Sequence, residues 1–227
     1  MMYMPRSFVQ AGGVVPSIDV YGLVYDGSSA GHGLKATVAG LTTSTMMAWI
    51  YSGPSPVINH SLFATATGKE QWWITSGNNL VIRANNTEKI ITISDNTWYH
   101  VCTQWLGSTT PIYINGSLAD TVAAGANELP GSTTHNVGQD DGDDNTFKGT
   151  IVDFIRMTGA KTPTDGNFDT GGGGQWKDVS GYTPGSGDYR LAADGGVVTN
   201  DYWSLASFAQ VTGTSVVASQ ANMPPGL

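Results

Sequence analysis

The segment at residues 97–118, TWYHVCTQWLGSTTPIYINGSL, limits the possible folds more than any other part of the sequence. Its first half alternates in the manner of a β-strand, whose successive side chains point to opposite faces. One face is expected to carry Tyr99, Val101, Thr103 and Trp105, and the other His100, Cys102 and Gln104. A second short strand at residues 111–114 leads into Asn115-Gly116, a pair that accepts positive φ and favours a two-residue turn. The segment therefore predicts a strand, a polar turn and a tight antiparallel hairpin.

Further strands are predicted on both sides of this hairpin. Short apolar or alternating runs are separated by Gly, Asn and Ser clusters about every 8 to 12 residues, which is typical of sandwiches and barrels. The runs lie at residues 20–25, 46–50, 57–64, 71–75, 80–84, 90–94 and 149–158. No window shows sustained helical periodicity. The sequence therefore predicts an all-β fold, and 227 residues are enough to bury a core.

Charge and cysteine content exclude several classes of function. The chain has 10 basic and 18 acidic residues, whereas nucleic-acid binding depends on clustered Lys and Arg. The single cysteine, Cys102, excludes an intramolecular disulfide and is expected to be buried and unreactive. No apolar stretch approaches the ~20 residues of a membrane span. We therefore expect neither nucleic acid nor a membrane as a partner.

Four segments, in this order along the chain, resemble the laminin-G-like, concanavalin-A-like jelly-roll family. They are LVYDGS at residues 23–28, MMAWI at 46–50, the hairpin segment at 97–118 and FKGTIVDFIRMT at 147–158. The resemblance covers roughly residues 19–165 and implies an antiparallel jelly-roll β-sandwich. Trp49 matches the family's core tryptophan and His100 its strand histidine, so the resemblance implies structural roles for both. The fold alone does not specify function, since this sandwich serves lectins, glycosidases and structural modules.

The last of these segments departs from the family pattern. Asp153 and Arg156 match it, but Phe154 stands where a second acidic residue is usual, and an extra residue lies within residues 149–152. The role that the family gives to its acidic pair is therefore not expected here. Asp153 is interpreted as a hydrogen-bonded residue at a strand end, and Arg156 as a charge on the solvent side.

Both ends of the chain differ in character from its middle. Residues 1–18 carry one charge, on Arg6, and residues 202–227 carry none. Because free tails usually stay soluble through charge and polarity, we expect both ends to lie against a surface, either the chain's own sandwich or a neighbouring subunit. The predicted organisation is an N-terminal arm at residues 1–18, a sandwich at 19–165, and a Gly-rich linker with a C-terminal extension at 166–227.

Catalysis is not expected. Glycoside hydrolysis requires two carboxylates on either side of a sugar, and Glu70, Glu88 and Glu128 lie far apart in the sequence. The strand signature of the glucanase relatives is absent, and the four histidines are isolated from one another. We therefore predict a non-enzymatic protein that requires no cofactor.

Two adjacent tryptophans give a candidate carbohydrate-binding site. Because strand side chains alternate, one of Trp72 and Trp73 is expected to point inward and the other outward. An outward indole offers a flat face on which a sugar or a partner protein can stack. Gln71, Asn78 and Asn79 would add polar groups beside it. The alternative is a tryptophan covered by a terminal arm or by a subunit contact.

The acidic loop at residues 140–145 is the candidate metal site. Such loops can supply several of the roughly 6 to 8 oxygen ligands that calcium takes, and the resemblance adds that laminin-G-like sandwiches often bind calcium at loop rims. The candidate ligands are Asp140, Asp141, Asp143, Asp144 and Asn145. Their spacing is not that of an EF-hand, and the alternative is a solvated acidic turn.

The favoured interpretation of function is a structural protein of a virus particle. The first residues lack the apolar run of a secretory signal, and a particle released by lysis needs neither export signal nor disulfides. Residues 153–158, followed by a small-residue loop and Pro163, resemble lectin-like domains of bacteriophage structural proteins. We expect a capsid decoration protein at the virion surface, made in the host cytoplasm, with copies of itself, capsid or tail proteins and host glycans as partners. The alternative is a carbohydrate-binding adhesin of a tail or fibre, or a secreted lectin module.

Overall fold

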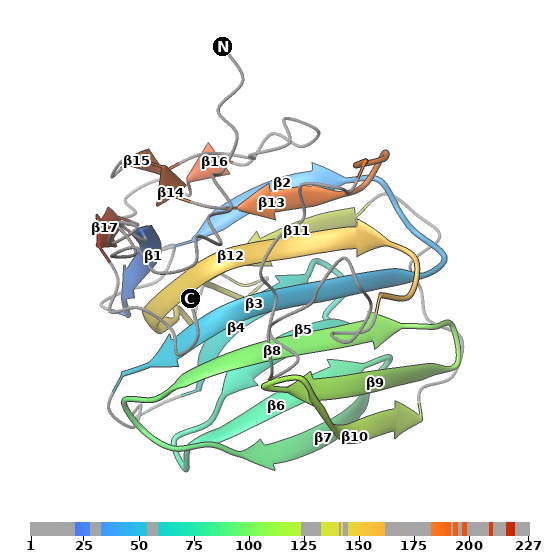
Figure 1. The fold of residues 1–227 in the computed structure, drawn as a ribbon, viewed down its shortest axis with the longest axis horizontal. Helices are drawn as coiled ribbons and strands as arrows, with labels where there is room; N and C mark the ends of the chain where they lie inside the picture. Colours follow the sequence, from blue (N-terminus) through green and yellow to red (C-terminus); the bar gives the residue numbers. More distant parts are fainter. Residues whose placement is uncertain are drawn as a thin grey trace, which may run out of the picture.

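The computed structural model consists of two antiparallel β-sheets that stack face to face as a sandwich (Figure 1). The structure describes residues 21–27, 33–53, 59–123, 133–140, 142, 145–161, 183–191, 193–194, 197–198, 209–210 and 217–220. All elements within these ranges are strands, and none of the described segments is a helix that could span a membrane. The predicted all-β antiparallel sandwich is confirmed.

The first sheet has eight strands and forms the front layer in Figure 1. Its strands are β1 (Tyr21–Asp26), β3 (Ser44–Ser52), β8 (Trp98–Trp105), β9 (Thr109–Ile114), β10 (Ser117–Ala123), β12 (Lys148–Thr158), β13 (Tyr189–Leu191) and β17 (Val217–Gln220). They run in the order β10-β9-β8-β3-β12-β1-β17, and β13 also pairs with β12.

The second sheet has seven strands and lies behind the first in the same view. Its strands are β2 (Leu34–Val38), β4 (His60–Thr65), β5 (Glu70–Ile74), β6 (Asn79–Ala84), β7 (Thr87–Thr92), β11 (Thr133–Val137) and β16 (Ala209–Gln210). They run in the order β16-β2-β11-β4-β5-β6-β7, so β4 to β7 form a meander of neighbours. Strands β14 (Ala193–Asp194) and β15 (Val197–Val198) pair only with each other.

The hairpin predicted within residues 97–118, with its turn at Asn115-Gly116, is confirmed. Asn115 and Gly116 connect β9 to β10 with φ of 48° and 80°, the positive values that a tight two-residue turn requires. The Asn115 side chain also accepts a hydrogen bond from the His100 backbone N–H at 2.9 Å, which ties the turn to β8. The alternation along β8 is confirmed as well, because Val101 and Cys102 belong to two different apolar clusters.

The main core fills the space between the sheets and is rich in aromatic rings. Phe154 of β12 lies 5.5 Å from Trp72 of β5 and 5.6 Å from Phe63 of β4, measured between ring centroids. Tyr189 of β13 stacks on Phe154 at 6.2 Å. All four side chains are fully buried. Burial of each large apolar side chain stabilises the fold by roughly 1.5 to 3 kcal/mol, so this cluster locks the two sheets together.

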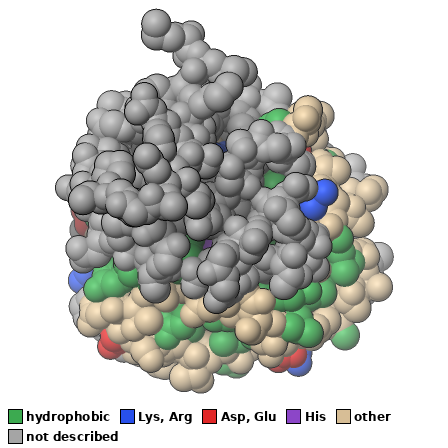
Figure 2. Space-filling model, viewed as in Figure 1, with side chains coloured by type: hydrophobic (Ala, Val, Ile, Leu, Met, Phe, Trp, Pro, Cys, Tyr) green, Lys and Arg blue, Asp and Glu red, His purple; other side chains and the backbone are tan. Residues whose placement is uncertain are grey.

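The outer face of the eight-stranded sheet carries further buried apolar side chains. Trp49 is 1% exposed and forms a cluster with Trp98 and Val152, separate from the main core. Burial of Trp49 is thus confirmed, although it lies on the outer side of its sheet. His100 contacts Trp49 edge to face at 5.3 Å, and burial lowers the pKa of its imidazole to about 3. His100 is therefore neutral and part of the packing, in line with its predicted structural role. Among the described residues visible from this side, charged side chains are few and scattered (Figure 2).

Strand β12 contains a bulge that changes which side chains face the core. Its pairing with β3 shifts register within residues 152–155, and Asp153 has a φ of 50°. One extra residue exchanges the two faces for the rest of the strand, so Phe154 and Arg156 both point inward. Arg156 is 0% exposed, and its interpretation as a solvent-side charge is wrong. Asp153 is hydrogen-bonded as predicted, because Arg190 Nε donates to it at 3.0 Å, but it lies at the bulge in the middle of β12 and not at a strand end.

Parts of the C-terminal region add strands to both sheets. Strand β17 pairs with β1, for example Ala218 with Leu23, and β16 pairs with β2. Of the two alternatives for the C-terminal end, residues 209–210 and 217–220 thus lie against the chain's own sandwich. The N-terminal arm expected at residues 1–18 lies outside the described residues.

Candidate functional site

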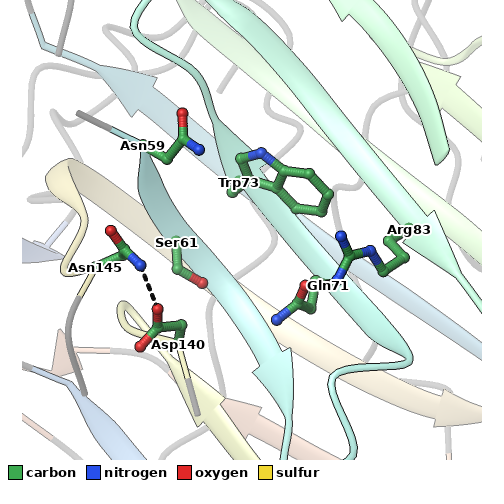
Figure 3. A pocket seen from close by; sticks show the side chains of 7 residues that line it. All are labelled: Asn59, Ser61, Gln71, Trp73, Arg83, Asp140 and Asn145. Carbon is green, nitrogen blue, oxygen red and sulfur yellow. Dashed lines mark hydrogen bonds between the residues drawn. The ribbon is translucent and has the colours of Figure 1, made fainter. Parts of the chain in front are cut away.

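A hollow of about 190 Å³ lies on the outer face of the seven-stranded sheet, beside the connection from β11 to β12 (Figure 3). Strands β4, β5 and β6, the residue that precedes β4 and the loop from β11 to β12 contribute its walls. The lining residues are Asn59, Ser61, Gln71, Trp73, Arg83, Asp140 and Asn145. Trp73, Gln71 and Arg83 stand on one side, and Asp140 and Asn145 on the other (Figure 3).

The loop side of the hollow is positioned by main-chain hydrogen bonds. Ser61 N–H donates to the Asn145 carbonyl at 3.2 Å, and Phe147 N–H donates to the Gly138 carbonyl at 2.8 Å. Gly138 has a φ of 83°, and a Cβ placed there would lie 2.0 Å from the Tyr25 ring. Only glycine fits this position, because any side chain would collide with that ring and strain the backbone. The loop base is therefore fixed by packing as well as by hydrogen bonds.

The strand side of the hollow is centred on Trp73, which is partly exposed. The Arg83 guanidinium lies over its indole, with Cζ 5.0 Å from the ring centroid. Arg83 Nη1 donates to Gln71 Oε1 at 2.9 Å, while its Nε and Nη2 donate to Glu88 Oε1 at 2.9 and 2.5 Å. Gln71, Arg83 and Glu88 are direct cross-strand partners, so sheet register builds this arrangement. The indole is held in place, and Glu88 balances the charge of Arg83.

Trp72 has a different position from its neighbour. Its side chain is 0% exposed and packs between the sheets against Phe63 and Phe154. A ligand therefore cannot reach its ring. This corrects the inclusion of Trp72 among the candidate carbohydrate-binding residues, whereas the expected outward position of Trp73 is observed.

Gln71 lines the hollow, but Asn78 and Asn79 do not. Asn78 lies in the tight turn between β5 and β6 with a φ of 57°, and Asn79 is the first residue of β6. The Asn79 amide donates to the Gly77 carbonyl at 3.3 Å and its oxygen accepts from Thr92 at 3.1 Å. The Asn79 amide is thus occupied by partners within the sheet and its turn, neither asparagine lines the hollow, and the polar groups beside the tryptophan are supplied by other residues.

The acidic loop supplies two residues to the same hollow. Asn145 Nδ2 donates to Asp140 Oδ2 at 2.5 Å, and both side chains line the wall opposite Trp73. Asp141, Asp143 and Asp144 lie outside the described residues. Within the described ranges no group of three acidic, histidine or cysteine side chains is placed to hold a metal ion. The structure therefore brings two of the five residues of each sequence-predicted site together at one place, namely Gln71, Trp73, Asp140 and Asn145.

Of the three carboxylates considered for glycoside hydrolysis, the two that the structure describes do not face one another. Glu70 points into the core and is 3% exposed, whereas Glu88 lies on the outer face of the seven-stranded sheet. Glu128 lies outside the described residues. Among the residues that line the hollow, Asp140 is the one carboxylate. These side chains can bind and orient a polar ligand, but they do not form the acid pair that hydrolysis requires.

Three lining residues were not singled out by the sequence: Asn59, Ser61 and Arg83. Arg83 could have been found from strand pairing, because it lies directly across from Gln71 once the β5–β6 turn is placed. Ser61 is paired with Trp73 in the same way. Asn59 lies before β4 and carries no sequence signal that distinguishes it from other polar loop residues.

The comparisons with known proteins agree with this architecture. A family model described as the concanavalin A-like lectin/glucanases superfamily matches residues 26–165, and the chain belongs to this superfamily. A search of curated proteins finds no match to the chain. The native heptameric SAP-like pentraxin of Limulus polyphemus has a similar fold, with a TM-score of 0.53, 18% identity, and 78% of this chain and 96% of that chain covered.

A second similar structure comes from Bacteroides ovatus ATCC 8483, a protein described as carbohydrate-binding. Its TM-score is 0.63 at 15% identity, and the match covers 90% of this chain and 61% of that chain. At such identities the similarity shows the fold, which is the lectin-like sandwich that the sequence resemblance implied.

Proposed function

We propose that the protein binds carbohydrate in the hollow beside Trp73. A sugar ring has an apolar C–H face and a rim of hydroxyl groups, so it fits a site that combines a flat aromatic surface with nearby hydrogen-bonding groups. The observation that carries the proposal is the partly exposed Trp73 indole, fixed under Arg83 and surrounded by the side chains of Asn59, Ser61 and Gln71. Membership of the superfamily supports the same function.

The test is a glycan array followed by calorimetric titration of the best binder with wild type and variants. Trp73→Ala removes the stacking surface and should weaken binding at least about tenfold. Leu118→Ser is the matched control, because Leu118 is 60% exposed on β10 of the other sheet and should leave the affinity unchanged. Equal affinity of Trp73→Ala and wild type would refute the proposal.

Calcium at the acidic loop is a further part of the proposal. Asp140 offers one carboxylate at the hollow, and the sequence adds three further acidic residues within residues 140–145. If the loop holds calcium, removal of the ion with a chelator should lower glycan affinity and the melting temperature. Asp140→Asn should weaken the response to added calcium. A melting temperature that is the same with chelator and with calcium would contradict this part.

Decoration of a virus particle is the second candidate function. It is supported by the sequence resemblance at residues 153–158 and by the exposed Leu118 on the free edge strand β10, which offers an apolar contact to a neighbouring subunit. Imaging of the native source particle tests it. Symmetric copies with β10 against shell proteins would support decoration, whereas single modules at a fibre tip would support an adhesin. Leu118→Asp should reduce incorporation into particles without changing glycan affinity.

A further inference from the structure

A row of apolar side chains crosses the outer face of the seven-stranded sheet from the hollow toward its edge. Trp73 of β5 is the direct partner of Val81 on β6, and Val81 is the partner of Ile90 on β7. Ile90 is 65% exposed, which is unusual for a large hydrophobic side chain, whereas Val81 is 2% exposed. In the other direction the row continues to Ser61, which lines the hollow. Trp73 is partly exposed and Ile90 is exposed, while Val81 between them is covered, so this apolar strip offers two accessible apolar side chains, one at the hollow and one near the sheet edge.

Polar rows border this strip on both sides. On one side Gln71, Arg83 and Glu88 are joined by the hydrogen bonds described above. On the other side Thr92 Oγ1 donates to Asn79 Oδ1 at 3.1 Å across β6 and β7. An apolar strip between two rows of hydrogen-bonding groups is suited to a chain of sugar rings, whose faces are apolar and whose edges carry hydroxyl groups.

The charges around the strip exclude a strong preference for acidic ligands. Arg83 is the cation beside Trp73, and it forms an ion pair with Glu88 at 2.5 Å. At the opposite wall of the hollow Asp140 contributes a carboxylate. In the calcium-free protein a sialic acid or a uronic acid would therefore have to compete with Glu88 for Arg83 and would be repelled by Asp140.

Resting on the proposed function, we infer that the ligand is a neutral, linear oligosaccharide that runs from the hollow across β5, β6 and β7, with Trp73 under one sugar ring and Ile90 under another. Two strand spacings separate these residues, a span of roughly 10 Å. A single hexose ring is shorter than this span, so only a chain of sugars can contact both side chains.

The test is an array that carries neutral glycans of increasing chain length, each with its sialylated counterpart, probed with wild type, Trp73→Ala, Ile90→Ser and the control Leu118→Ser. Wild type should bind longer neutral chains more tightly than short ones. Ile90→Ser should weaken binding of long chains about three- to tenfold and leave the shortest bound glycan unchanged. Leu118→Ser should behave as wild type.

The outcomes separate this inference from the proposed function. If Trp73→Ala loses binding but Ile90→Ser binds every chain length as wild type does, the hollow is a carbohydrate site and the extended track is refuted. Tighter binding of sialylated than of neutral glycans also overturns the inference. If no glycan binds, or if Trp73→Ala has no effect, the proposed function itself fails. A dimer in light scattering that Ile90→Ser dissociates would assign the strip to a second copy of the chain.

Discussion

Glu70 places a carboxyl group in the interior of the sandwich. Replacing Glu70 with glutamine tests whether this carboxyl group is buried and neutral in the folded protein. Its side chain is 3% exposed, and neither carboxyl oxygen has a hydrogen-bond partner among the described residues. Burial raises the pKa of Glu70 to about 8, while the nearby Arg156 guanidinium opposes that rise. Glu70 is therefore expected to be neutral in the folded protein at neutral pH.

The sign of the pH dependence follows from proton counts. Below pH 4.5 the carboxyl is protonated in both the folded and the unfolded state. Between that value and about 8 the folded protein holds a proton that the unfolded chain has released, so the free energy of unfolding falls by about 1.4 kcal/mol per pH unit. From about pH 5 to about pH 8 the loss amounts to roughly 3 kcal/mol. Gln at position 70 is always neutral and should not show it.

Urea unfolding followed by tryptophan fluorescence measures this difference. The stability of Glu70→Gln minus that of wild type should grow by roughly 3 kcal/mol from about pH 5 to about pH 8. Glu88→Gln is the matched control: its carboxylate is 39% exposed in a surface ion pair, so its effect should stay within about 1 kcal/mol at every pH. A difference for Glu70→Gln that shrinks with rising pH would show an ionised Glu70 paired with Arg156, and would refute the reasoning.

Three further predictions concern stability and reactivity. Gly138→Ala should lower stability by at least about 2 kcal/mol in urea unfolding, because the added Cβ would meet the Tyr25 ring at 2.0 Å. Gly68→Ala, which meets nothing within 4 Å but has a φ of +65°, should cost only about 1 kcal/mol, and equal losses would contradict the packing described. Phe154→Ala should cost roughly 3 to 5 kcal/mol by the same assay, and a loss below 1 kcal/mol would show that its ring is not central to the core. Burial raises the pKa of the Cys102 thiol, so a thiol reagent at neutral pH should react at the rate of unfolding; fast labelling of the native protein would show that the site is open.

Local rules predicted the hairpin and most strands of the sandwich because each depends on neighbouring residues, but they missed β2 and β11. The alternation along β8 and the turn chemistry of Asn115 and Gly116 are set within a few positions of the chain. The same rule predicted that only one of Trp72 and Trp73 would face outward. The observed strand ends differ from the predicted ones by a few residues, because backbone hydrogen bonds to strands that are distant in sequence decide where a strand ends.

The inward position of Arg156 shows where such rules fail. The bulge at Asp153 depends on how β12 pairs with β3, about a hundred residues earlier in the chain, and it reverses the faces of every following residue. Simple alternation contains no information about that change. The set of residues that line the hollow could not be predicted from the sequence for a similar reason. Trp73 and Asp140 come to line one hollow only when the loop from β11 to β12 packs against β4.

The position of β1 has a consequence for synthesis of the protein in the cell. One edge of β1 pairs with β12 and the other with β17, so Leu23 finds its two partners at Ile151 and Ala218. A nascent chain therefore carries β1 with an unpaired edge until residues 217–220 leave the ribosome. Such late closure is slow, and an open edge can accept a strand from another chain in the meantime. Newly made copies that are crowded together would thus exchange their last strands more readily than any internal one.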